Sequence, residues 1–133
     1  MLFDSLGHAT IDGKWLNSNL DASFETYSQE LEKNGYLGGL VVGIYDQNKY
    51  EHESFLNSSK DYKNLYPIAG FNPVEHSLNS LSKLKEDGFI GIKIRPRFSN
   101  IDLEKDKQIL IDCFQKCTEI DLPVFFCSYY HCG

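Results

Sequence analysis

The sequence lacks the features that would bring a protein to a membrane or to a nucleic acid. It contains no apolar run approaching the roughly 20 residues that a membrane-spanning helix needs. Its 13 Lys and Arg residues are outnumbered by 19 Asp and Glu residues, which gives a formal net charge of -6. Such a chain has no general basic field for phosphate backbones or anionic lipids. We therefore expect neither a nucleic acid nor a membrane as its partner.

Two sorting and binding motifs are also missing. Asp4 interrupts the start of the chain before a basic segment and a long apolar stretch could form, so no secretory signal is predicted. A cytoplasmic location is expected by default, and there the four cysteines should be reduced. No Gly-x-Gly-x-x-Gly or P-loop motif follows the first predicted strand, so nucleotide binding has no support in the sequence.

What remains is the composition of one globular domain, residues 1–133, with 41% hydrophobic and 24% charged residues. Short apolar segments bounded by glycine or proline predict five β-strands. They cover residues 2–6, 37–45, 65–71, 88–96 and 122–127. Segments with apolar residues at helical spacing predict four intervening helices. These cover residues 21–34, 50–56, 72–88 and 102–120.

Strands that alternate with helices predict a parallel sheet with right-handed crossovers. One arrangement is a partial (β/α)8 TIM barrel, because a closed barrel takes about 250 residues and this chain has roughly half of them. The other is an open, flavodoxin-like sheet with strand order 2-1-3-4-5. Only six residues follow the fifth predicted strand, and none forms a covering helix. We therefore expect the first half of a barrel whose remainder is missing or lies on another chain.

Two of the predicted helices have a recognisable start. Asn72, followed by a proline, is typical of a helix N-terminus, and Asp102 is the expected N-cap of the last helix. Cys113 and Cys117 lie four residues apart on the apolar side of that helix and are expected in the core. His52 and His76 lie in polar helical surroundings, so both are expected at the solvated surface.

Two cations stand at the C-terminal end of the fourth predicted strand. Lys93 and Arg95 are two residues apart, so their side chains leave the strand on the same face, which Phe89 and Gly91 share. Ligands of parallel α/β sheets bind at the carboxyl ends of the strands. A Lys/Arg pair there suits a carboxylate or a phosphate, and we expect both residues in catalysis and substrate binding. The alternative is that both charges pair with nearby acidic side chains.

Further candidates follow the first and fifth predicted strands. His8 ends the first strand and is a catalytic candidate, while Trp15 in the next loop either covers a ligand or packs on the barrel rim. Past the fifth strand, His131 is a second catalytic candidate, and Tyr129 lines the same mouth or a subunit interface. Cys127 is either a core thiol or a partner of His131 in nucleophilic catalysis.

Three phrases of the sequence resemble amidohydrolase-related (amidohydrolase family 2) TIM-barrel proteins. Residues 3–8 are similar to the opening of these proteins, where an apolar residue and an Asp precede His-x-His. Residues 88–96 resemble their fourth strand, often Gly-Phe-x-Gly-x-Lys-x-x-Pro, and residues 122–127 resemble their fifth, where Leu-Pro-Val leads to a histidine. The phrases occur in the family's order and at its spacing across essentially the whole chain.

The sequence departs from this family at its metal ligands. Leu6 stands where the first metal histidine is expected, and Cys127 replaces the histidine of the fifth strand. Lys93 falls at or near the position of the family's metal-bridging lysine. The resemblance therefore implies no two-metal site. It leaves either a single zinc held by His8, Cys127 and one further ligand, or a metal-free site like that of lactonases in this superfamily.

The function implied by the resemblance is that of a hydrolase acting on a small anionic lactone, amide or sugar-derived substrate. Lys93 and Arg95 would orient the anion, and His8 would position water or the metal. The alternatives are a non-catalytic barrel half that serves in binding or assembly, and a flavodoxin-like domain for a small ligand. Besides the substrate, the expected partner is a second copy of the chain or the missing C-terminal half.

Overall fold

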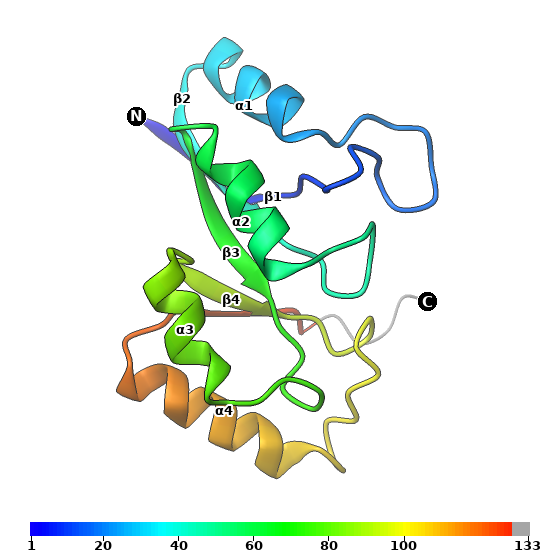
Figure 1. The fold of residues 1–133 in the computed structure, drawn as a ribbon, viewed down its shortest axis with the longest axis vertical. Coiled ribbons are helices and arrows are strands. Elements are labelled where there is room, and N and C mark those ends of the chain that lie inside the picture. The colour runs from blue at the N-terminus through cyan, green and yellow to red at the C-terminus, as the bar shows by residue number, and fades with distance from the viewer. Residues whose placement is uncertain (129–133) are drawn as a thin grey trace.

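The computed structural model describes residues 1–128, in which strands and helices alternate as the sequence predicts (Figure 1). The strands are β1 (Leu2–Gly7), β2 (Tyr36–Val42), β3 (Leu65–Gly70), β4 (Gly91–Ile94) and β5 (Val124–Phe126). The helices are α1 (Phe24–Lys33), α2 (His52–Lys60), α3 (Ser80–Asp87) and α4 (Lys107–Glu119). Among the helices of residues 1–128, none combines the length and the apolar character needed to cross a bilayer.

All five strands are parallel, and they stand side by side in chain order, β1-β2-β3-β4-β5. A doubly wound sheet reverses the direction of strand addition at its middle, so the flavodoxin-like alternative is wrong. Sequential order and the curl of the sheet are those of a barrel arc. The predicted partial (β/α)8 architecture is confirmed.

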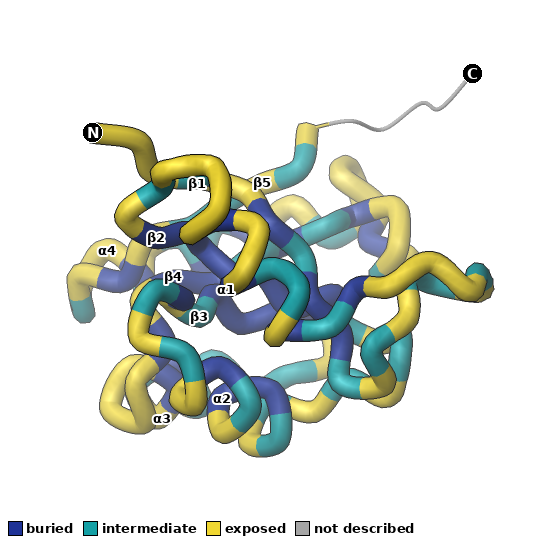
Figure 2. Tube along the Cα trace, turned by 90° about the horizontal axis from the view of Figure 1, so that it is seen from above, coloured by how far each residue is buried: buried dark blue, intermediate teal, exposed yellow. Residues whose placement is uncertain are grey.

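The main core lies between the sheet and the helices. Every second strand residue faces this side, as Val41, Ala69 and Ile92 do, and all three are fully buried. Apolar residues of all four helices join them in one continuous cluster, which includes Cys113 and Cys117 as predicted. Figure 2 shows this buried interior beneath the more exposed β1.

The opposite face of the sheet has the alternate strand residues and a much smaller apolar cluster. Leu40, Val42 and Ile68 are buried there, with Phe125 packed against them. In a TIM barrel this face lines the interior. The concave face therefore carries the interior side chains of about half a barrel, while Phe3 at its edge is 49% exposed.

The first helix begins and ends as its sequence predicts, with a small shift at the start. Ser23 Oγ accepts a hydrogen bond from Thr26 N at 3.2 Å, so the N-cap is Ser23 and helix α1 starts at Phe24. Gly35, with a φ of +76°, follows the last turn, where a residue without a Cβ is preferred.

The predicted starts of the third and fourth helices are wrong. Asn72 Oδ1 accepts from Val74 N at 3.0 Å, which makes a local turn, and α3 begins only at Ser80. Asp102 Oδ1 accepts from the amides of Glu104 and Lys105, so it stabilises a separate turn ahead of α4. In both places a side chain bonded to nearby backbone favours a turn over a helix.

Strand β4 is shorter than predicted, and Phe89 is not on the face that carries the two cations. The strand begins at Gly91, and Phe89 is 2% exposed within the helix-side core, with its ring centroid 5.9 Å from that of His52. Gly91 does lie on the concave face, where its backbone is close to Ile68 and Phe125.

Candidate functional site

The carboxyl end of β1 brings His8 to the rim of the sheet. Asp4 pairs with Gly39 and Gly7 with Val41, so three steps along β1 match two along β2, and the strand bulges. Just past this bulge, His8 Nδ1 lies 2.9 Å from the carbonyl oxygen of Val42.

This contact fixes the tautomer of the neutral imidazole. A carbonyl oxygen only accepts hydrogen bonds, so His8 Nδ1 carries the proton and Nε2 keeps its lone pair. Burial lowers the pKa of His8, and the charges of Arg95 and Lys93 lower it further against the opposing effects of Val42 and Asp4. His8 is therefore a neutral base at pH 7.

Lys93 and Arg95 stand on the concave face at the end of β4. Lys93 pairs in register with Gly70 of β3 and Phe125 of β5, which places it among the interior residues. The Arg95 guanidinium carbon lies 4.2 Å from the centre of the Phe98 ring, a cation–π contact. Within residues 1–128, buried Arg95 Nε and Nη1 have no hydrogen-bond partner.

The predicted alternative, that these cations pair with rim carboxylates, is wrong for the described part of the chain. There, ion pairs join only Lys33 to Glu30 and Lys83 to Asp87, both on exposed helix surfaces. A buried donor without a partner costs about 1–3 kcal/mol. The described residues therefore leave Nε and Nη1 of Arg95 unsatisfied.

The charges of the candidate residues at the rim act on one another. Burial lowers the pKa of Lys93, Arg95 lowers it further, and a thiolate at Cys127 acts in the opposite direction. Burial also lowers the pKa of Arg95, again opposed by Cys127. His8 lies 2.9 Å from Val42 O at the end of β2, and Cys127 N donates to Ile94 O at the end of β4 at 3.0 Å. His8, Lys93, Arg95 and Cys127 therefore all lie at or just past the carboxyl ends of strands in one parallel sheet.

Of the remaining predicted residues, Trp15 joins this rim. Its ring centroid lies 5.5 Å from that of His8, and a hydrogen bond from Trp15 N to Leu20 O holds its loop. Tyr129 and His131 lie outside the described residues.

The described donors do not fit a zinc site. His8 and Cys127 supply two ligands at most, whereas zinc sites in proteins use three or four. Within residues 1–128, no three His, Cys, Asp or Glu side chains come close enough to hold a metal together. Asp4, the acidic neighbour of His8, accepts a hydrogen bond from Tyr27 at 3.0 Å.

Two histidines that were expected at the surface are packed at the end of β3, so that prediction is wrong. His52 Nε2 lies 2.7 Å from Gly70 O, and His76 Nδ1 accepts from Asn72 N at 3.0 Å. Their ring centroids are 5.3 Å apart. The sequence offered one signal, the aromatic residues Tyr45 and Tyr50 nearby. It could not show which way the imidazoles point.

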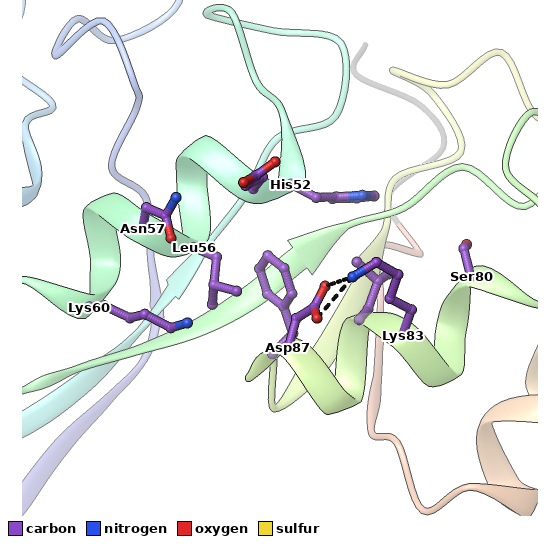
Figure 3. A pocket seen from close by; sticks show the side chains of 10 residues that line it. His52, Leu56, Asn57, Lys60, Ser80, Lys83 and Asp87 are labelled. Atoms are coloured by element: carbon purple, nitrogen blue, oxygen red, sulfur yellow. Dashed lines mark hydrogen bonds and ion pairs between the residues drawn. The ribbon is translucent and has the colours of Figure 1, made fainter.

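A cavity of about 430 Å³ lies between α2 and α3 on the helix side (Figure 3). Its lining includes the apolar side chains of Leu56 and Phe89 and the cation of Lys60. Lys83 and Asp87 pair across 2.7 Å on its α3 side. Acidic and basic side chains both line it.

The fold matches solved structures, although no family model and no curated protein matches the sequence. An Acinetobacter baumannii protein, provisionally named 2-pyrone-4,6-dicarboxylic acid hydrolase and crystallised with citric acid, aligns over 94% of this chain with a TM-score of 0.68 and 17% identity. An Agrobacterium tumefaciens protein aligns over 94% with a TM-score of 0.68 and 12% identity. A Pseudomonas putida protein with the same provisional hydrolase name aligns over 93% with a TM-score of 0.54 and 14% identity.

These alignments cover 48%, 47% and 55% of the three neighbours, respectively, so the chain spans about half their length. At such identities the likeness shows the fold alone. The chain has the fold of one half of the barrels found in these hydrolase-named proteins.

Proposed function

We propose that the rim formed by His8, Lys93 and Arg95 is the anion-binding part of a hydrolase site of the amidohydrolase-related type. The single observation that carries this proposal is the half-buried Arg95 side chain, whose buried Nε and Nη1 have no partner within residues 1–128. It stands beside a second cation and a neutral imidazole in a protein whose net charge is -6. Positive charge gathered at one place in an otherwise acidic chain favours the binding of an anion there.

The substrate class proposed is a small dicarboxylate that contains a lactone or a similar acyl bond. Two neighbours are provisionally named hydrolases of 2-pyrone-4,6-dicarboxylic acid, a lactone with two carboxylates, and one of them was crystallised with citric acid. A guanidinium binds a carboxylate through two parallel hydrogen bonds. In this proposal Arg95 takes one carboxylate of the substrate and fixes its orientation.

The other two residues act on the acyl group. Lys93, a point charge on a flexible stem, stabilises the negative charge that develops on the carbonyl oxygen. Neutral His8 accepts a proton at Nε2 from the attacking water, since its Nδ1 proton is bonded to Val42 O. The acyl C–O bond then breaks, and His8 returns this proton to the leaving oxygen. The lowered pKa of His8 keeps this base unprotonated at pH 7. Any further groups would come from the other half of the barrel.

The test is a calorimetric titration of the 133-residue chain with citrate at pH 7.5 and low salt. We expect binding in the unmodified chain and a loss of at least about tenfold in Arg95→Met, since hydrogen bonds to a charged group are worth about 1.5–3 kcal/mol. The matched control is Arg97→Met, because Arg97 is exposed and lies two residues along. Equal citrate affinity of Arg95→Met and the unmodified chain would sink the proposal.

A second candidate function is anion binding without turnover. It is favoured by Leu6, which stands where the resemblance expects a metal-binding histidine and cannot bind a metal. Hydrolysis of 2-pyrone-4,6-dicarboxylate opens the conjugated ring, so loss of its near-ultraviolet absorbance measures turnover. Citrate binding that depends on Arg95, with no loss of pyrone absorbance, would select this second function.

A further inference from the structure

The backbone at the carboxyl end of β3 is held by three side chains on the helix side of the sheet. Gly70 N donates to Tyr50 Oη at 2.9 Å, and Gly70 O lies 2.7 Å from His52 Nε2. Asn72 N donates to His76 Nδ1 at 3.0 Å. Residues 70–72 are thus fixed from outside the sheet, at the rim where ligands of such folds bind.

The contact between Asn72 and His76 requires an uncharged imidazole. A backbone N–H only donates, so His76 Nδ1 is the acceptor and its proton lies on Nε2. A second proton on the ring would sit on Nδ1 and face the Asn72 N–H, which breaks the bond. His52 differs, because its Nε2 faces a carbonyl oxygen and donates in either charge state.

The surroundings of His76 keep it neutral. Burial lowers its pKa, His52 lowers it further, and the carboxylates of Glu75 and Asp46 act in the opposite direction. Tyr45 Oη donates to Glu75 Oε2 at 2.6 Å, which engages one of these carboxylates. The pKa of His76 therefore lies below its ordinary value near 6.5.

Asn72 connects this histidine to the Arg95 site. Its side chain is 2% exposed, and Nδ2 donates to Ser99 O at 3.4 Å in the loop after β4. Ser99 N in turn donates to Arg95 O at 3.1 Å. Ser99 also follows Phe98, whose ring makes the cation–π contact with the Arg95 guanidinium. A continuous path of contacts thus runs from His76 through Asn72 and Ser99 to Arg95.

We propose that Asn72 and His76 are positioning residues of the anion site. Neutral His76 holds Asn72, Asn72 holds the loop that contains Phe98, and this loop keeps the Arg95 guanidinium facing the ligand. The inference rests on the proposed anion site and adds a pH dependence to it. Acidification releases the loop and weakens anion binding.

The sign of this effect separates it from the titration of His8. As pH falls below about 6.5 towards the lower pKa of His76, protonation removes the Asn72 contact and affinity drops. Protonation of His8 adds a positive charge at the site and raises the affinity for anions. Sulfate is a suitable probe, because it stays doubly charged across this range.

The experiment is a sulfate titration by calorimetry from pH 8 to pH 5 on the chain and on His76→Asn. The asparagine amide oxygen takes the place of Nδ1 and accepts from Asn72 N at every pH. We expect affinity in the unmodified chain to fall by about fivefold relative to His76→Asn, the worth of one hydrogen bond. The control, His52→Gln, should keep this fall in affinity but move it to higher pH, because His76 loses the neighbour that lowers its pKa. Identical pH profiles for the chain and His76→Asn would overturn the inference.

A second measurement does not depend on ligand binding. In nitrogen-15 NMR spectra of the free chain, the Ser99 amide and Arg95 Nε signals should shift with the titration of His76, and this shift should vanish in His76→Asn. If the chemical shifts of the Ser99 amide and Arg95 Nε did not change as His76 titrates, the inference would also be overturned. Absence of sulfate binding at pH 8, with these NMR shifts present, would instead reject the proposed function and leave the positioning role supported.

Discussion

At the scale of single residues, the Arg95 side chain is the feature that most needs an explanation. Its Nε and Nη1 are buried without a hydrogen-bond partner in residues 1–128, while its guanidinium carbon lies 4.2 Å from the centre of the Phe98 ring. Such an arrangement costs stability in the absence of a ligand. Sites that bind or react commonly retain groups that the fold alone would not favour.

Replacing Arg95 with methionine should therefore stabilise the ligand-free protein. Methionine keeps an apolar contact with Phe98 and removes the unpartnered donors, so we expect Arg95→Met to raise the free energy of unfolding by about 1 kcal/mol. Urea denaturation in a buffer without sulfate, phosphate or citrate measures this change. Arg97→Met, at an exposed position, should stay within about 0.5 kcal/mol of the unmodified chain. A destabilised Arg95→Met would mean that the guanidinium has a partner.

At the scale of elements, the helices differ in how their N-termini are stabilised. Ser23 Oγ accepts from Thr26 N at the start of α1, whereas Glu51 before α2 makes no such side-chain bond. Helix α1 thus has a local signal that fixes its first turn, and α2 depends on Phe55 and Leu56 in the core. Most helical stability in proteins comes from such packing.

This difference predicts unequal effects of alanine at the two N-caps. Ser23→Ala should lower the free energy of unfolding by about 1 kcal/mol, because Thr26 N loses its acceptor. Glu51→Ala removes no capping bond and should change stability by less than about 0.5 kcal/mol. Urea denaturation of both variants tests this, and hydrogen exchange at Thr26 should accelerate only in Ser23→Ala. Equal losses in the two variants would contradict the assigned cap.

At the scale of the whole molecule, one large core joins all four helices to strands β2, β3 and β4. The helix-side cluster extends from Phe24 and Phe55 to Leu110 and Cys117, so no helix has a core of its own. The concave face contributes only a small cluster beside the rim. A single core favours a single cooperative unfolding transition.

Two measurements test whether the protein unfolds in a single cooperative transition. Unfolding curves from far-ultraviolet circular dichroism and from the fluorescence of Trp15, the only tryptophan, should coincide. Phe55→Ala should cost about 3–5 kcal/mol, because Phe55 is 1% exposed and its ring centroid lies 5.1 Å from those of Phe24 and Tyr50. Phe3→Ala is the control, since Phe3 is 49% exposed and should cost clearly less. Separate transitions would argue against one core.

Much of the fold could be predicted from local patterns, whereas the site could be predicted only in part. Lys93 and Arg95 share a face because strand residues alternate, and that period is visible in the sequence. Whether acidic partners would neutralise them depended on side chains from other elements. Asn72 shows the opposite failure, since a sequence typical of a helix start folds as a turn that serves distant contacts.

The sequence by itself determined the alternation of strands and helices, and thus the parallel sheet, because these signals depend on residues a few positions apart. The tertiary structure decided the sequential strand order, which separates a barrel arc from a doubly wound sheet. It also decided the neutral states of His8 and His76 and the unpartnered state of Arg95 within the described residues. The reason is physical: burial and hydrogen-bond partners come from segments distant in the chain, and no local pattern encodes them.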